Sequence, residues 1–233
     1  MSSEDWKRAA AKVAAKLVKD DMAVGLGSGT TVYELVRALA EIKPKAKYVA
    51  SSSATQQLAD RLGLELSSLG ELPELDLALD GADEVAPDFT MIKGGGGAHT
   101  REKIVAGAAK RVVIIVDQGK LVKNIGETWP VPTEVLPFAH QNTASRLKKL
   151  GGDPKLRLVS EGQPYITDNG NYILDVKFKT IEKPEELEKK INQIPGVIEN
   201  GIFCNVADQV IVGHSGGVEI LKSPEDFSKF LKD

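Results

Sequence analysis

The feature that most constrains the fold is a regular alternation of short apolar runs with amphipathic segments. Apolar residues recur at helical spacing over residues 4–19, at Trp6, Ala10, Val13 and Leu17, which predicts an amphipathic helix. The same reasoning predicts further helices over residues 31–42, 54–63 and 101–110, and apolar strands over residues 22–27, 46–53, 75–84 and 111–120. Strands that alternate with helices indicate a mostly parallel sheet covered on both faces.

A second pattern begins near Trp129. The segment WPVPTEVLPF contains three prolines, which suit an edge strand or a connection rather than a central strand. From there we predict strands over residues 131–136, 155–160, 172–179 and 197–203, and helices over residues 142–150 and 184–193. This βαββαβ order is that of a ferredoxin-like α+β unit.

The end of the chain returns to the first pattern. QVIVG, residues 209–213, is a further apolar strand, and SPEDFSKFL, residues 223–231, predicts a helix with Ser223 as N-cap and Pro224 at its first position. We expect this strand to rejoin the first sheet. Residues 1–128 and 205–233 would then form one discontinuous α/β domain, an open Rossmann-like sheet, with residues 129–204 as an inserted smaller domain.

Charge and composition narrow the class of protein. The formal net charge is −3, and nothing suggests the basic patch or stripe of a nucleic-acid binder. The N-terminal segment is charged throughout and lacks the apolar core of a signal peptide. No apolar run approaches the roughly 20 residues of a membrane span. The single Cys204 excludes an internal disulfide and fits a reducing cytosol, so we expect a cytoplasmic protein with no membrane partner.

Ligands of open parallel sheets bind beyond the carboxyl ends of the strands. In this chain small hydroxyls, glycines, lysines and acids gather at those ends. They lie in five segments: Gly27–Thr31, Ser51–Ser53, Asp80–Asp83, Lys93–Gly97 and Gly119–Lys120. This clustering predicts a binding site at one edge of the sheet.

The motif GLGSGTT admits more than one interpretation. It could be only a tight strand-to-helix turn. A dinucleotide fingerprint would need a third glycine where Thr30 stands, and a P-loop would need a closing Gly-Lys-Ser/Thr. What remains is a monophosphate site, in which amides at a helix N-terminus and the hydroxyls of Ser28, Thr30 and Thr31 point at the anion. Lys120 could balance its charge.

The motif DGADE places Asp80 and Asp83 three residues apart in a turn. These acids could simply be solvated side chains of an Asx-type turn. Two carboxylates near a phosphate would also suit magnesium, although the spacing is one residue longer than in Asp-x-Asp phosphatases. A third interpretation, hydrogen bonding and proton exchange with sugar hydroxyls, requires no metal.

The segment KGGGGAHTREK is the most unusual stretch of the chain. Four glycines follow Lys93, and Glu102 lies in the first turn of the next helix, with Thr100 as the expected N-cap. The helix dipole alone would favour an acid at that position. Successive bare amides, however, form an anion-binding nest, and Lys93 adds a cation beside it. A base, a nest and a phosphate site are the parts needed for proton abstraction next to a carbonyl.

GLGSGTT, DGADE, KGGGGA with the following REK, and the Gly119-Lys120 turn together resemble the ribose-5-phosphate isomerase type A family over essentially the whole chain. The resemblance implies interconversion of D-ribose 5-phosphate and D-ribulose 5-phosphate, without cofactor or metal, by a homodimer or homotetramer. It implies Glu102 as catalytic base, with Asp80, Asp83 and Lys93 at the reacting end. The substrate would also contact further residues, namely Lys7, Ser28, Gly29, Thr30, Thr31, Gly81, Ala82, Gly94, Gly95, Gly96 and Lys120.

Two other classes compete with the isomerase. A sugar-phosphate-sensing module of a regulator would need a DNA-binding helix-turn-helix, and the N-terminus has room for only one helix. A transferase or amino-sugar isomerase on the same fold would use other acid and histidine placements. His99, His140 and His214 are scattered along the chain, which does not suggest a histidine metal site.

Overall fold

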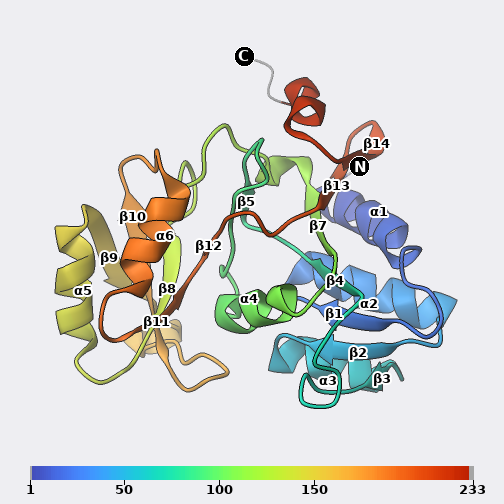
Figure 1. Ribbon diagram of the computed structural model, residues 1–233, viewed down its shortest axis with the longest axis horizontal. Coiled ribbons are helices and arrows are strands. Elements are labelled where there is room, and N and C mark those ends of the chain that lie inside the picture. The colour runs from blue at the N-terminus through green and yellow to red at the C-terminus, as the bar shows by residue number, and fades with distance from the viewer. Residues whose placement is uncertain (1, 231–233) are drawn as a thin grey trace.

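The computed structural model describes residues 2–230, which form a seven-stranded sheet and a four-stranded sheet, each with its own helices, and a three-stranded sheet of short strands (Figure 1). The helices are α1 Ser3–Ala15, α2 Thr30–Ile42, α3 Ser53–Arg61, α4 His99–Gly107, α5 His140–Lys149 and α6 Pro184–Asn192. The strands of the large sheet are β1 Ala23–Leu26, β2 Lys47–Ala50, β3 Glu65–Leu66, β4 Leu77–Asp80, β7 Val112–Asp117, β13 Gln209–His214 and β14 Gly217–Leu221.

The large sheet has the order β14-β13-β7-β4-β1-β2-β3. All neighbours in it are parallel except β13 and β14, which form an antiparallel pair at one edge. The prediction of an open, mostly parallel sheet is therefore confirmed. The expectation that residues 209–213 rejoin this sheet is also confirmed, because β13 pairs with β7.

Helix α1 begins at a capping box. Ser2 N donates to Asp5 Oδ2 at 2.8 Å, and Asp5 N donates to Ser2 Oγ at 3.4 Å, which satisfies amides that have no partner inside the helix. Its buried face is built from alanines, which let the helix approach the sheet closely. The predicted helix runs on to residue 19, whereas α1 ends at Ala15 and a tighter turn follows, closed by Leu17 N bonding to Ala14 O at 2.9 Å.

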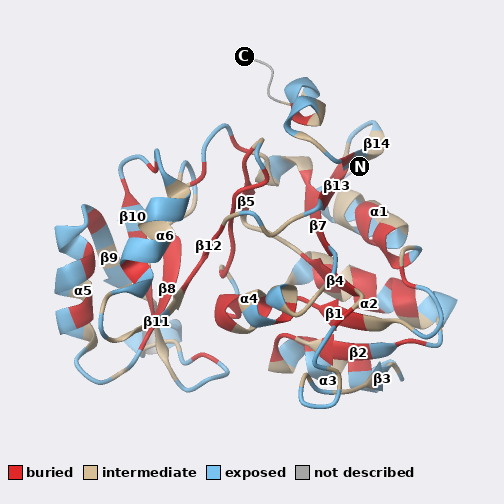
Figure 2. Cartoon of the chain, viewed as in Figure 1, coloured by how far each residue is buried: buried red, intermediate tan, exposed pale blue. Residues whose placement is uncertain are grey.

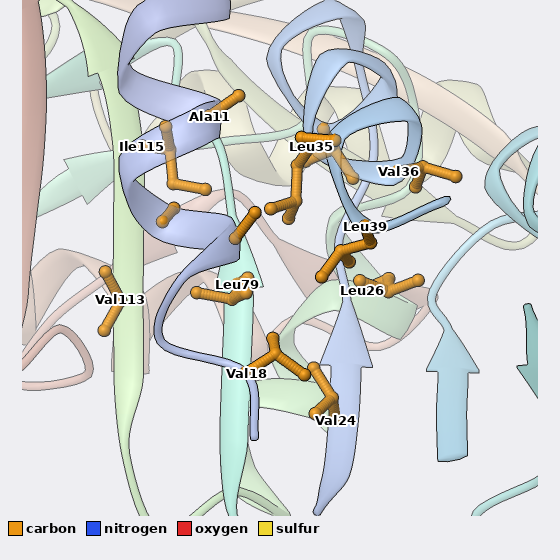
Figure 3. Close-up of a cluster of buried hydrophobic side chains, with 14 of the residues drawn as sticks. Ala11, Val18, Val24, Leu26, Leu35, Val36, Leu39, Leu79, Val113 and Ile115 are labelled. Carbon is orange, nitrogen blue, oxygen red and sulfur yellow. The ribbon is translucent and has the colours of Figure 1, made fainter. Parts of the chain in front are cut away.

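The two faces of the large sheet are covered by different elements. Figure 3 shows Ala11 of α1 and Leu35 of α2 packed toward Leu79 and Ile115 of the strands, in a core that also includes Ala59 of α3. On the opposite face, α4 and the C-terminal turn pack their own apolar residues. The central strands β4, β7 and β13 between them are almost wholly buried (Figure 2). Within residues 2–230, none of the helices combines the length and the apolar character needed to cross a membrane.

The smaller unit has the predicted βαββαβ element order. Its strands are β8 Val131–Val135, β9 Gly152–Leu156, β10 Tyr172–Phe178 and β11 Val197–Asn200, in the antiparallel order β11-β8-β10-β9. Residues from all four strands and from α5 and α6 share one core. The unit lies at the far end of the molecule from α1, with α4 between the two sheets (Figure 1). We propose that residues 129–204 form an inserted domain.

The proline-rich segment was wrongly expected at an edge, because β8 lies between β10 and β11. Its prolines are tolerated there by position. Pro130 and Pro137 flank the strand, and Pro132 lies beyond the last residue that β11 pairs with. At that point the partner is Gly201, whose N–H donates to Pro132 O at 2.7 Å. No ladder bond therefore requires the missing proline N–H.

Several smaller expectations also need correction. The strand predicted over residues 155–160 is β9, which runs from Gly152 to Leu156 because it pairs with β10 from Phe178, opposite Gly152, to Leu174, opposite Leu156. The strand predicted over 197–203 is split, because β12 Ile202–Phe203 leaves the small sheet and pairs with β6. Short strands that the pattern did not predict are β3, β14, and the pair β5 Glu84–Val85 and β6 Met91–Ile92.

The predicted C-terminal helix is a shorter turn than expected. Residues Pro224–Lys229 form a 3-10 helix, η3, and the last residue of the prediction, Leu231, lies outside the described residues. The predicted start is confirmed, since Ser223 N donates to Asp226 Oδ2 at 3.1 Å in a capping box. Two further 3-10 turns are η1 Gln118–Lys120 and η2 Ser160–Gly162.

Candidate active site

A cavity lies at the carboxyl ends of the parallel strands, where the sequence placed the site. Nearly all the predicted residues line it: Lys7, Ser28, Gly29, Thr30, Thr31, Gly81, Ala82, Asp83, Lys93, Gly94, Gly95, Gly96, Glu102 and Lys120. Asp80 is not one of the lining residues but contacts Lys93, which is. Ser51–Ser53 do not line this cavity; Ser52 instead caps α3, accepting from Thr55 N at 3.1 Å.

Three charged side chains meet in one part of this cavity, and we call Asp80, Lys93 and Glu102 the charge cluster. Lys93 Nζ lies 2.9 Å from Asp80 Oδ2 and 3.2 Å from Glu102 Oε2. It also donates to Gly81 O at 2.5 Å. Asp80 is 7%, Lys93 3% and Glu102 4% exposed, so these charges interact with little screening by water.

Burial and mutual contact shift the ionisation of the cluster. Burial raises the pKa of Glu102, and the nearby Asp80 carboxylate raises it further, against the opposite effect of Lys93. Burial alone would lower the pKa of Lys93, but Asp80 and Glu102 outweigh it and raise that pKa. The ammonium therefore stays charged while the glutamate is a stronger base than usual, which suits proton abstraction beside a developing negative charge.

The chain approaches this cluster closely at Gly27 and Ser28. A Cβ on Gly27 would lie 1.8 Å from Asp80 Oδ1, so only glycine fits there. Asp80 Oδ1 accepts from Ser28 N at 3.1 Å and from Gly81 N at 2.7 Å. The Ser28 hydroxyl donates to Glu102 Oε1 at 2.5 Å. Ser28 thus orients the glutamate, a contact that its expected role as a phosphate donor did not include.

The start of α2 lines another part of the cavity, and we call residues 29–31 with Lys7 and Lys120 the cradle. Gly29 is the N-cap at φ +92° and ψ 176°, a conformation essentially confined to glycine. Lys7 Nζ, on α1, lies 3.3 Å from Thr30 Oγ1. The two lysines and the helix N-terminus make this part favourable for an anion.

The last acid of DGADE has a structural role that supports Lys120. Glu84 is fully buried and accepts hydrogen bonds from the amides of Thr128 and Trp129, at 2.6 and 2.7 Å. The Trp129 ring in turn lies 5.1 Å from Lys120 Nζ, a cation–π contact. The motif therefore contributes to both parts of the cavity.

Glycines 94–97, the glycine loop, are required mainly by close contacts. Gly94 and Gly97 have φ of +102° and +81°. A Cβ on Gly95 would lie 2.7 Å from Asp83, and one on Gly97 would lie 2.5 Å from the Tyr165 hydroxyl. Two of the four amides bond within the protein, Gly95 N to Asp83 Oδ2 at 2.6 Å and Gly97 N to Gly94 O at 2.9 Å. Within residues 2–230, the amides of Gly94 and Gly96 have no such partner, so they are the two of the four predicted nest amides that remain free to bind an anion.

Sequence reasoning missed the residues of the small unit that hold this region. Arg157 and Tyr165 donate to carbonyls of the glycine loop. Thr100 is not the N-cap of α4, because the helix begins at His99 and its N-cap is Ala98. The Thr100 hydroxyl donates to the buried Glu134 instead. Burial would raise the pKa of Glu134, but hydrogen bonds from Thr100 and three further side chains lower it. These contacts join residues more than 30 positions apart, so no local sequence motif predicts them.

The histidines stay apart in the fold, and His99 is buried with its Nε2 3.3 Å from Glu199 O. Among residues 2–230, no group of three or more histidine, cysteine or acidic side chains is placed to hold a metal ion. The magnesium interpretation of DGADE meets a specific obstacle. Asp80 Oδ2 is already paired with the Lys93 ammonium at 2.9 Å, and Asp83 Oδ2 accepts from Gly95 N at 2.6 Å.

Comparison with known proteins agrees with this geometry. The family model of ribose 5-phosphate isomerase A (phosphoriboisomerase A) matches residues 47–217. Ribose-5-phosphate isomerase A of Thermosynechococcus vestitus is 48% identical over 216 residues, which cover 90% of this chain and 92% of that protein.

Solved structures give the same result. Ribose 5-phosphate isomerase A of Methanocaldococcus jannaschii superposes with a TM-score of 0.91 at 45% identity, covering 95% of this chain and 100% of that one. A D-ribose-5-phosphate isomerase in complex with phospho-erythronic acid superposes with a TM-score of 0.92 at 41% identity and the same coverage. With its sequence, fold and cavity in agreement, this chain belongs to the ribose 5-phosphate isomerase A family.

Proposed function

We propose that this protein interconverts D-ribose 5-phosphate and D-ribulose 5-phosphate, an aldose–ketose isomerisation of the non-oxidative pentose phosphate pathway, with Glu102 as general base. The observation that carries the proposal is the contact of Lys93 with both Asp80 and Glu102, in the same cavity that the cradle lines. The related isomerase in complex with phospho-erythronic acid supports a phosphorylated sugar derivative as the ligand.

The chemistry begins with the open-chain aldose. Glu102 takes the proton from C2, the C2–H electron pair forms the C1=C2 bond, and the carbonyl pair moves onto O1. Lys93 stabilises the resulting cis-enediolate, because preorganised charge is most effective where negative charge develops. The C2 hydroxyl then passes its proton to O1, and the electron pair left on O2 forms the C2=O bond of the ketone. At the same time the C1=C2 pair takes the proton back from Glu102 at C1. No atoms are gained or lost overall, so the reaction needs no redox partner.

Ring opening precedes this step, and we assign it to Asp83 rather than Asp80. Asp80 is occupied, since its Oδ1 accepts from two amides and its Oδ2 contacts Lys93. Asp83 borders the cavity itself. Burial raises the pKa of Asp83, partly offset by the hydrogen bond from Gly95 N, so this carboxyl is suited to exchange a proton with a sugar hydroxyl.

The cradle would hold the phosphate. Lys7 and Lys120 supply positive charge, and Gly29, Thr30 and Thr31 present the start of α2. Binding energy gained there, remote from C1 and C2, can position the reacting carbons against Glu102. Unphosphorylated ribose should therefore be a very poor substrate.

A direct assay tests the proposal. The pure, chelator-treated protein is incubated with D-ribose 5-phosphate, and ketose is measured over time. We expect ketose formation without added metal or cofactor. Absence of ketose across a range of buffers would refute the assignment, and activity only after a metal is restored would refute the metal-free mechanism.

We also propose that the protein works in the cytoplasm as a homodimer or homotetramer. A reducing compartment is supported by Cys204, which is the single cysteine of the sequence and has no partner for an internal disulfide. Association is supported by large apolar side chains left exposed on one chain, including Ile104 and Phe138. Light scattering coupled to size-exclusion chromatography would give the mass in solution, and a monomer would contradict the association.

A further inference from the structure

The glycine loop is held from outside by two side chains of the small unit. Arg157 Nη1 donates to Gly94 O at 2.9 Å and to Gly95 O at 3.0 Å. The Tyr165 hydroxyl donates to Gly96 O at 3.0 Å. We propose that Arg157, assisted by Tyr165, is a positioning residue that sets the orientation of the loop's peptide groups for catalysis, an inference that rests on the proposed function.

Arg157 is itself fixed before it reaches the loop. Its guanidinium makes two hydrogen bonds to Asp175 of β10, Nε to Oδ2 at 2.9 Å and Nη2 to Oδ1 at 2.5 Å. It also lies over the Tyr165 ring, 5.8 Å from its centroid. A planar, bidentate arginine of this kind has little freedom left to lose. Asp175 of β10 therefore holds the guanidinium so that Nη1 of Arg157 reaches the loop in one orientation.

Peptide planarity turns this contact into control of the amides. In a trans peptide the N–H points opposite to the C=O of the preceding residue. Holding Gly94 O therefore aims Gly95 N–H away from Arg157, and this amide donates to Asp83 Oδ2 at 2.6 Å. Holding Gly95 O aims Gly96 N–H the same way. Gly96 borders the cavity, and its N–H has no hydrogen-bond partner among residues 2–230.

The loop needs such a restraint because it has no side chains of its own. Consecutive glycines have the largest backbone entropy to lose on ordering. A Cβ on Gly96 would meet nothing within 4 Å, so packing does not fix that residue. Arg157 and Tyr165 instead hold three consecutive carbonyls, from positions more than 60 residues further along the chain. Loss of this restraint would misplace both the ring-opening acid and the free amide that faces the substrate.

The test compares Arg157→Ala, Arg157→Lys and Tyr165→Phe with a matched control, Lys177→Ala. Lys177 lies on the same strand as Asp175 and also donates to two backbone carbonyls, those of Gly126 and Glu127, away from the loop. For each protein we would measure kcat and KM for ribose 5-phosphate. Inhibition by phospho-erythronic acid probes the whole cavity, and inhibition by inorganic phosphate probes the cradle alone.

We expect Arg157→Ala to lower kcat by about 10²-fold, the usual cost of misplacing catalytic groups. Arg157→Lys keeps the charge but not the fork, so we expect a smaller loss, roughly tenfold. Tyr165→Phe removes one neutral hydrogen bond and should cost about two- to tenfold. Phospho-erythronic acid should bind the Arg157 variants more weakly while inorganic phosphate binds as before. The Lys177→Ala control should match the parent protein.

The inference is overturned if Arg157→Ala keeps kcat within about threefold of the parent, far from a misplaced site. It is equally overturned if inorganic phosphate binding falls as much as phospho-erythronic acid binding, since the damage is then general. If Arg157→Ala does not fold, Arg157→Lys decides by the same criteria.

Amide hydrogen exchange separates this inference from the proposed function. The amides of Gly95 and Gly97 are hydrogen-bonded in the folded protein and should exchange faster in the Arg157 variants than in the parent and in Lys177→Ala. Unchanged exchange refutes the positioning role whether or not the parent isomerises ribose 5-phosphate. Faster exchange in an inactive parent would support the restraint on the loop and refute only the proposed function.

Discussion

The two parts of the cavity are built in different ways. Most of the cradle comes from one continuous segment at the start of a helix, and its two lysines approach it from α1 and η1. The charge cluster instead joins Asp80, Lys93 and Glu102 from three segments, each less than 10% exposed. In the cradle each group adds a contact of its own. In the cluster each charge is tolerated only because the others are present.

The largest difference should follow from removing a lysine from each part. Lys93→Met leaves two buried carboxylates without their cation, and we expect unfolding free energy to fall by about 3–5 kcal/mol. Lys120→Met removes a half-buried cation that packs against the Trp129 ring, and we expect a loss below about 1 kcal/mol. Urea unfolding of both variants measures the contrast. Equal losses would show that the cluster is not mutually dependent.

Substrate affinity should show the opposite contrast. We propose that Lys120 contacts the phosphate, and a charged contact of this kind is commonly worth about 1.5–3 kcal/mol, so Lys120→Ala should raise KM by roughly 10- to 100-fold. The turnover number should fall less, because the phosphate is remote from the reacting carbons. Steady-state kinetics of this variant give both quantities. If ribose 5-phosphate binds the variant as tightly as the parent, Lys120 does not hold the phosphate.

Two glycines test how tightly the cluster is enclosed. A Cβ at Gly27 would overlap the Asp80 carboxylate, so Gly27→Ala should cost about 1–3 kcal/mol and also lower turnover. The control is Gly107→Ala in α4, where a Cβ meets nothing within 4 Å and alanine favours the helix by about 1 kcal/mol. Thermal melts and turnover numbers distinguish them. A harmless Gly27→Ala would mean that Asp80 can move freely.

The smallest effect concerns pH. The pKa of Glu102 is raised in the folded state, so its contribution to stability is complete below the ordinary value of about 4.5 and is lost as pH rises through the raised value. Gln does not titrate. Glu102→Gln should therefore gain stability relative to the parent as pH rises, by at most about 1.4 kcal/mol per pH unit. If Glu102→Gln instead lost stability relative to the parent as pH rises, the raised pKa of Glu102 would be contradicted.

The same contrast explains how much the sequence could predict. The cradle is local, so its glycines and hydroxyls were readable in GLGSGTT, and the alternation of strands and helices placed it at the correct edge of the sheet. The contact of Ser28 with Glu102 spans 74 positions and depends on how α4 packs beside β1. Arg157 and Tyr165 carry no motif at all, because their partners are backbone carbonyls.

The misplaced elements have a similar cause. The prolines of β8 indicated an edge strand. β8 can nevertheless lie between β10 and β11 because Gly201, which follows β11, lies opposite Pro132, so that no strand residue there requires a proline N–H. Thr100 has the side chain of an N-cap, yet tertiary contact with the buried Glu134 uses its hydroxyl instead. In both cases a distant residue decided between locally reasonable alternatives.

The most direct test of the account is the turnover number of Glu102→Gln with ribose 5-phosphate. The substitution keeps the shape of the side chain and removes the proton acceptor. We predict a loss of at least about 10²-fold, as expected for a missing general base, while phospho-erythronic acid still binds and the protein stays folded. Turnover within about threefold of the parent would contradict the account, because a lost general base costs far more.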